Sequence, residues 1–124
     1  MSDGITALPL TFKELREANL ARAKDWNPSG KPLGIEFAAL ELCGETGEFA
    51  NEIKKALRAK AGIAGGKVDN EAVEDELADV AICVSLMAIA LDVDISEIVE
   101  RKFNKTSEKH GFKSLREYLS RGDK

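Results

Sequence analysis

Residues 80–91 form a twelve-residue apolar run in which Ser85 is the single polar side chain. The run does not alternate with period two, as a half-buried strand would. It is also too short to cross a bilayer, which takes about 20 residues. A helix that is apolar all round must be covered on every side. A chain of 124 residues has few elements with which to cover it. We therefore expect the other helices and a second subunit to surround it together, in a homodimer or homotetramer.

Helix start and stop signals divide the remaining chain. Thr11-x-x-Glu14, Asp94-x-x-Glu97 and Ser114-x-x-Glu117 are capping boxes, Pro32 fits a first helical position, Asp69 or Asn70 fits a cap, and Gly111 fits a stop. Together they predict helices over 12–25, 32–61, 70–91, 95–109 and 115–120, with a flexible loop over 62–69. The predicted fold is all-α: a bundle of four main helices plus a short C-terminal helix, completed by oligomerisation, in one domain over 1–124.

Composition excludes several classes of protein. Eighteen basic against 22 acidic residues give a net charge of −4, which argues against nucleic-acid binding. Residues 1–7 lack a signal-peptide pattern, and no segment is long enough to span a membrane. Cys43 and Cys83 are too few for a disulfide scaffold, and both fall within apolar patterns, so we expect two buried thiols. We expect a cytoplasmic protein.

Acidic residues on the second predicted helix form a narrow stripe. At 100° per residue they fall within a 60° arc that borders the apolar positions. The stripe comprises Glu41, Glu45, Glu48 and Glu52. Like charges four residues apart destabilise a helix by about 0.2–0.5 kcal/mol. Glu52 has Lys55 nearby, whereas the other three have no basic neighbour one turn away, so a non-local group must neutralise them.

The third predicted helix supplies a second pair, Glu76 and Asp79, whose side of the helix turns apolar one turn later. Glu-x-x-Glu facing Glu-x-x-Asp gives an all-oxygen ligand set, which Mg²⁺ and Mn²⁺ prefer. Acidic stripes are also common on solvated faces. The macrodipole alone explains Glu71, Glu74 and Asp75 at the start of this helix.

The residues from Glu41 to Phe49, followed by Asp75-Glu76-Leu77-Ala78-Asp79-Val80, resemble the signature of the MazG-like superfamily of all-α nucleoside triphosphate pyrophosphohydrolases. That signature is Glu-x-x-Glu, a spacer, and Glu-x-x-Asp. The Gly-Glu-x-Gly-Glu motif resembles the corresponding sequence of the MazG and dCTP pyrophosphatase-like branches. The resemblance covers about residues 12–112.

The resemblance implies a Mg²⁺-dependent enzyme, with Mn²⁺ as a substitute, that cleaves a (d)NTP to the (d)NMP and pyrophosphate in nucleotide-pool housecleaning. By motif match the metal ligands are Glu45, Glu48, Glu76 and Asp79. Glu45 or Glu41 would accept a proton from the attacking water.

The resemblance extends to Trp26, a candidate for stacking on a base, and to Lys102 and Lys109, which are candidates for contacting the outer phosphates. Lys54 is a further candidate for a phosphate contact, and each of these lysines also fits a plain solvated side chain. The family pattern of Lys followed four residues later by Asn is broken at Thr106, and Asn104 is the candidate that compensates. Trp26 fits a core residue equally well. Two other functions stay open: a helical assembly or regulatory protein that has lost catalysis, and a different metal-dependent enzyme.

Overall fold

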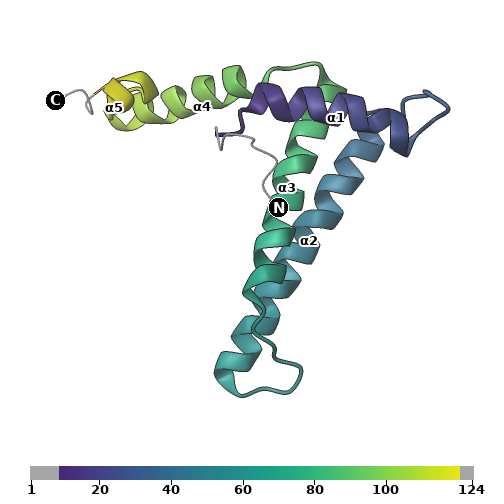
Figure 1. Cartoon of the computed structure of the whole chain (residues 1–124). Coiled ribbons are helices and arrows are strands. Elements are labelled where there is room, and N and C mark those ends of the chain that lie inside the picture. Colours follow the sequence, from purple (N-terminus) through teal and green to yellow (C-terminus); the bar gives the residue numbers. More distant parts are fainter. Residues whose placement is uncertain (1–8, 121–124) are drawn as a thin grey trace. The chain divides into compact units, whose positions relative to one another are not determined.

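The computed structural model describes residues 9–120 as an all-α fold, as the sequence predicts (Figure 1). Its helices are α1 (Phe12–Trp26), α2 (Gly34–Ala61), α3 (Asn70–Leu91), α4 (Ile95–His110) and α5 (Leu115–Ser120). The chain divides into two compact units, Met1–Leu91 and Asp92–Lys124, which we describe separately. The single domain over 1–124 stays a prediction. Residues 1–7, in which we found no signal-peptide pattern, lie outside the described residues.

The first turns of α1, α3, α4 and α5 each have a side-chain cap at a residue that the sequence predicts. Thr11 and Glu14 form a reciprocal capping box, and Asp94 accepts hydrogen bonds from the backbone N–H groups of Ser96 and Glu97. Gly111 adopts a left-handed conformation, with φ of 72°, after α4. The predicted start of α2 at Pro32 is wrong. Gly34 has φ of 91°, a value that a right-handed helix cannot continue through, so α2 begins there.

The α2 and α3 helices lie side by side as an antiparallel hairpin (Figure 1). The loop between them, predicted to be flexible, folds back on the end of α2. The Lys67 N–H donates to the Lys55 carbonyl at 3.0 Å. A Cβ at Gly66 would collide with the backbone of Arg58 and Ala59, so only glycine permits this approach. The loop therefore fixes where α3 begins along α2.

The α1 helix packs on α3, crossing the hairpin near the end of α3 (Figure 1). Asn19 is the buried residue of α1, and its side-chain N–H₂ group has no hydrogen-bond partner within residues 9–120. On α3 the buried residues are Cys83, Ser85 and Ala88.

Burial of apolar side chains is sparse. Among the described residues the buried apolar ones are Ala38, Cys83 and Ala88, and no large side chain is fully buried. Most of the apolar run over 80–91 is half-buried, and Leu91 is 49% exposed. The described helices thus leave this run partly uncovered, and the homodimer or homotetramer stays a prediction. In the described part of the chain, no helix has the length and apolar character needed to cross a membrane.

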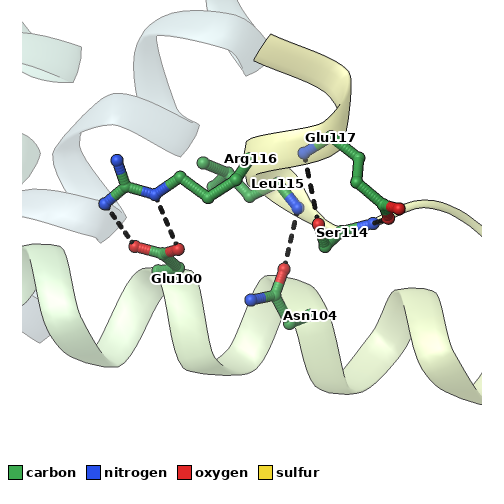
Figure 2. A network of polar contacts seen from close by, with 6 residues as sticks. All are labelled: Glu100, Asn104, Ser114, Leu115, Arg116 and Glu117. Carbon is green, nitrogen blue, oxygen red and sulfur yellow. Dashed lines mark hydrogen bonds and ion pairs between the residues drawn. The ribbon is translucent and has the colours of Figure 1, made fainter. Parts of the chain in front are cut away.

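The second unit is held together by polar contacts between α4 and the start of α5 (Figure 2). Glu100 accepts two hydrogen bonds from the Arg116 guanidinium, both at 2.9 Å. The Asn104 side-chain oxygen accepts from the Leu115 N–H at 2.8 Å. The hydrogen bonds that Arg116 donates, and its positive charge, lower the pKa of Glu100 below its usual value. Phe103 and Tyr118 meet edge to face, with ring centroids 6.2 Å apart.

Candidate metal centre

Three carboxylates from the two hairpin helices converge. Glu45 lies on α2, while Glu76 and Asp79 lie one turn apart on α3. One carboxylate oxygen from each lies within 4.8 Å of the other two. Because Glu76 and Asp79 are three residues apart, they point to the same side of α3. The antiparallel packing of α2 then brings Glu45 to that side.

The two half-buried members, Glu45 and Glu76, each have a carboxylate oxygen that is shielded from water and has no hydrogen-bond partner. Burial raises the pKa of both carboxyl groups, and neighbouring carboxylates, with Glu48 first among them, raise them further. Buried polar atoms without partners are rare, because each forfeits its interaction with water. The pair therefore lacks a positive partner among the described residues.

The remaining members of the predicted stripe surround this group. Glu48 and Glu41 are exposed, and Glu48 stands outside the three converging oxygens. Both charges nevertheless act on Glu45. Glu52 is half-buried and forms an ion pair with Lys55 at 3.1 Å, as the spacing predicts.

The donor set fits a hard divalent cation. All three ligand atoms are carboxylate oxygens, which Mg²⁺ and Mn²⁺ prefer, and two of the carboxylates each have one shielded oxygen without a hydrogen-bond partner among the described residues. Mg²⁺ binds oxygen at about 2.1 Å, so oxygens on opposite sides of the ion are about 4.2 Å apart. Oxygens at adjacent positions around the ion are only about 3.0 Å apart, so the three oxygens, which lie within 4.8 Å of one another, would have to move closer together to bind one ion.

The other predicted site residues of the first unit do not join the carboxylates. Lys54 follows Glu45 by nine residues, which is half a turn out of phase, so it projects from the opposite side of α2. There it lines a shallow surface depression with Gly47 and Asn51. Trp26 is 76% exposed at the end of α1, which excludes a core role within the described structure. The Arg22 guanidinium lies 5.9 Å from its ring centroid.

The predicted phosphate contacts Lys102 and Lys109 lie on α4 in the second unit, together with Asn104. Lys102 lines a cavity of about 630 Å³ bounded by α4 and α5. The cavity's other lining residues are Phe103, Thr106, Ser107, Phe112 and Tyr118. Lys109 is exposed. The Asn104 side-chain oxygen already accepts a backbone hydrogen bond at the start of α5, so this residue has a structural use (Figure 2).

The expectation of two buried thiols is wrong for Cys43, which is exposed, and right for Cys83. Cys43 lies on the side of α2 turned away from α3. Cys83 lies one turn after Asp79, and burial together with the nearby carboxylates raises its pKa to about 11. The sequence pattern already places Cys83 on the side of this helix that carries Glu76 and Asp79 and turns apolar one turn later.

The two thiols should therefore differ in reactivity. Because thiolate is the reactive form, Cys83 in the folded protein should react with N-ethylmaleimide at pH 8 at least about 100-fold more slowly than Cys43. Peptide mass spectrometry after timed quenching measures both rates. The denatured protein, in which both thiols are accessible, serves as the control. Equal rates in the folded protein would contradict the burial of Cys83.

The chain belongs to the MazG-like family, whose model matches residues 34–118. The matched segment begins with α2 and includes all three converging carboxylates. The chain is also similar to the Gene 37 protein of Mycobacterium phage L5, with 38% identity over 72 residues. That match covers 58% of this chain and 62% of the phage protein, so the chain spans less than two thirds of the length of this relative.

Proposed function

We propose that this protein is a Mg²⁺-dependent nucleoside triphosphate pyrophosphohydrolase. It cleaves a ribo- or deoxynucleoside triphosphate to the monophosphate and pyrophosphate, a reaction suited to clearing the nucleotide pool. The observation that carries the proposal is the convergence of Glu45, Glu76 and Asp79, two of them with unpartnered buried oxygens, inside a MazG-like chain.

The carboxylates cannot meet the substrate alone. A triphosphate carries about four negative charges near neutral pH, and the acidic cluster repels it. In the proposal Glu45, Glu76 and Asp79 hold Mg²⁺, with Glu48 as a further ligand. Bound Mg²⁺ neutralises phosphate charge and polarises the phosphorus that is attacked.

The proton of the attacking water also needs an acceptor. Glu41 is exposed, lies one turn before Glu45 on α2, and keeps a carboxylate free of the three converging oxygens. We assign it, or Glu45, the role of general base. The water oxygen forms a bond to the α phosphorus, and the bond between the α phosphorus and the oxygen that bridges it to the β phosphate breaks. The leaving group is pyrophosphate, and the carboxylate takes the proton.

Substrate contacts outside the cluster are assigned by the family resemblance. Trp26 offers an exposed ring on which a base can stack. Lys102 and Lys109 would contact the outer phosphates. Lys54 and Asn104 keep only the sequence argument, because the first projects away from the carboxylates and the second is used at the α4–α5 junction.

Product analysis tests the proposal. Purified protein with Mg²⁺ and a panel of ribo- and deoxynucleoside triphosphates should release monophosphate and pyrophosphate in equal amounts, as measured by anion-exchange chromatography. Stepwise release of orthophosphate would contradict it. The absence of turnover by folded protein on every substrate would favour the helical assembly or regulatory protein instead.

A further inference from the structure

Lys55 is the basic residue of α2 that lies on the same side of the helix as the acidic stripe. At 100° per residue it falls about 50° from the middle of the stripe, whereas the other basic residues of α2 fall at least about 90° away. Those others are Lys54, Arg58 and Lys60, and α3 has no basic residue. The carboxylates of the stripe and of the Glu76–Asp79 pair therefore have one ammonium group beside them on their own two helices.

An ion pair holds this ammonium group next to the candidate metal centre. The Lys55 Nζ donates to a Glu52 carboxylate oxygen at 3.1 Å. The charge of Glu52 is among those that raise the pKa of Glu76, so Glu52 lies near the converging oxygens. Side chains of a helix lean toward its N-terminus, which directs Lys55 toward Glu52. The ammonium group thus lies near the level of Glu52, which is about 6 Å along α2 from Glu48.

The ion pair presents its positive member to solvent. The Lys55 side chain is 35% exposed, whereas the side chain of Glu52 is 16% exposed. An ammonium group has three N–H donors, and Glu52 accepts one of them. Two donors therefore stay available to water or to an anion that approaches from the solvent side.

The proposed reaction supplies an anion that fits this place. When the bond to the α phosphorus breaks, the negative charge passes to the pyrophosphate leaving group. A positive group that is already in position beside that charge lowers the barrier, because it needs no rearrangement during the reaction. Lysine also binds phosphate as a point charge, so it tolerates different orientations of the phosphate oxygens.

We propose that Lys55 contacts the β and γ phosphates of the substrate, which leave as pyrophosphate, and that Glu52 positions its ammonium group. This inference rests on the proposed function. Before substrate binds, Glu52 holds the ammonium group beside the carboxylates. When substrate is bound, the remaining N–H groups donate to phosphate oxygens. Lys55 thus takes the role that the sequence suggested for Lys54, which lies on the opposite side of α2 from Glu45.

Titration calorimetry of inorganic pyrophosphate in excess Mg²⁺ tests this contact without turnover. Lys55→Gln should weaken pyrophosphate binding at least about 10-fold, because a hydrogen bond between charged groups is lost. Lys55→Arg keeps the positive charge and should stay within about threefold of the wild type. The matched control is Lys60→Gln, at an exposed position about 140° around α2 from Lys55, and it should stay within about twofold. Circular dichroism checks that each variant is folded.

A double variant separates a phosphate contact from simple neutralisation of Glu52. Glu52→Gln combined with Lys55→Gln removes both charges, so no half-buried carboxylate loses its partner, and it should fold even if Lys55→Gln alone does not. If Lys55 only neutralised Glu52, the double variant would regain the wild-type affinity for pyrophosphate. Under the proposal its affinity stays at least about 10-fold weaker.

Three results would overturn the proposal: a wild type that does not bind pyrophosphate at millimolar concentration, wild-type affinity in the folded double variant, or a larger loss in Lys54→Gln than in Lys55→Gln. Failure of the proposed function gives a different result. Hydrolysis by the wild type, with an unchanged KM and unchanged pyrophosphate affinity in Lys55→Gln, would contradict the role of Lys55 alone. Pyrophosphate binding that depends on Lys55, without turnover of any nucleotide, would contradict the pyrophosphohydrolase alone.

Discussion

Asp79→Asn should reduce pyrophosphohydrolase activity at least about 100-fold at millimolar Mg²⁺, while the protein stays folded. The amide keeps the size of the side chain and removes the charge that would help hold the cation. Asp79 is exposed, so the fold does not depend on its ionisation. Initial rates of pyrophosphate release, together with circular dichroism, measure the two effects separately.

A matched control lies on the same helix. Glu74 is exposed and projects from the side of α3 opposite Glu76, so Glu74→Gln should keep activity within about twofold. Glu48→Gln should lose most activity, because Glu48 is the neighbouring charge that acts most strongly on Glu76. If Asp79→Asn and Glu48→Gln both retain nearly full activity, the proposed metal centre is wrong.

Mg²⁺ should raise the melting temperature of the wild type at pH 8 by about 10 °C when its concentration reaches 100 times the dissociation constant. At pH 5 the rise should be much smaller, because protons compete with Mg²⁺ for carboxylates whose pKa values are raised. The stability of the metal-free protein should depend on pH as well. Because the pKa values of Glu45 and Glu76 are raised, the metal-free protein should be more stable at pH 5 than at pH 8.

The greater stability of the metal-free protein at lower pH follows from proton linkage. A carboxyl group with a raised pKa in the folded state holds its proton more tightly there than in the unfolded chain. Its stabilising contribution is complete below the unfolded pKa and disappears as the pH rises through the folded pKa. Glu100 and Glu117 have lowered pKa values, so their contributions disappear only as the pH falls through those lowered values. The window from pH 5 to 8 therefore reports mainly the cluster.

Glu76→Gln separates the cluster from other titrations. Without metal at pH 8 it should melt at or above the wild-type temperature, because one repelling charge is gone. It should also lose most of the stabilisation by Mg²⁺. Differential scanning calorimetry with EDTA or Mg²⁺ measures both effects. A metal-free wild type that melts at the same temperature at pH 5 and pH 8, or a Glu76→Gln variant with the full response to Mg²⁺, would contradict the prediction.

Local chemistry made most of the helical pattern predictable. Thr11, Asp94 and Gly111 act through groups a few residues away, so their effects can be read from spacing alone. The start of α2 could not be read in this way. Its position depends on the left-handed backbone of Gly34, and Pro32 two residues earlier gives the more familiar signal.

The position of each carboxylate on its helix could be predicted from the sequence, but the contacts between carboxylates of different helices could not. Their periodicity on each helix follows from 3.6 residues per turn, so the acidic stripe of α2 and the Glu76–Asp79 pair were accessible from the chain order. Which of them meet depends on how far α3 is displaced along α2, and the packed loop at Gly66 sets that displacement. Tertiary packing thus brings Glu45 to Glu76 and Asp79, leaves Glu48 beside them, and turns Lys54 and Cys43 outward. No periodicity within a single helix encodes that selection, because it belongs to the relative register of two helices.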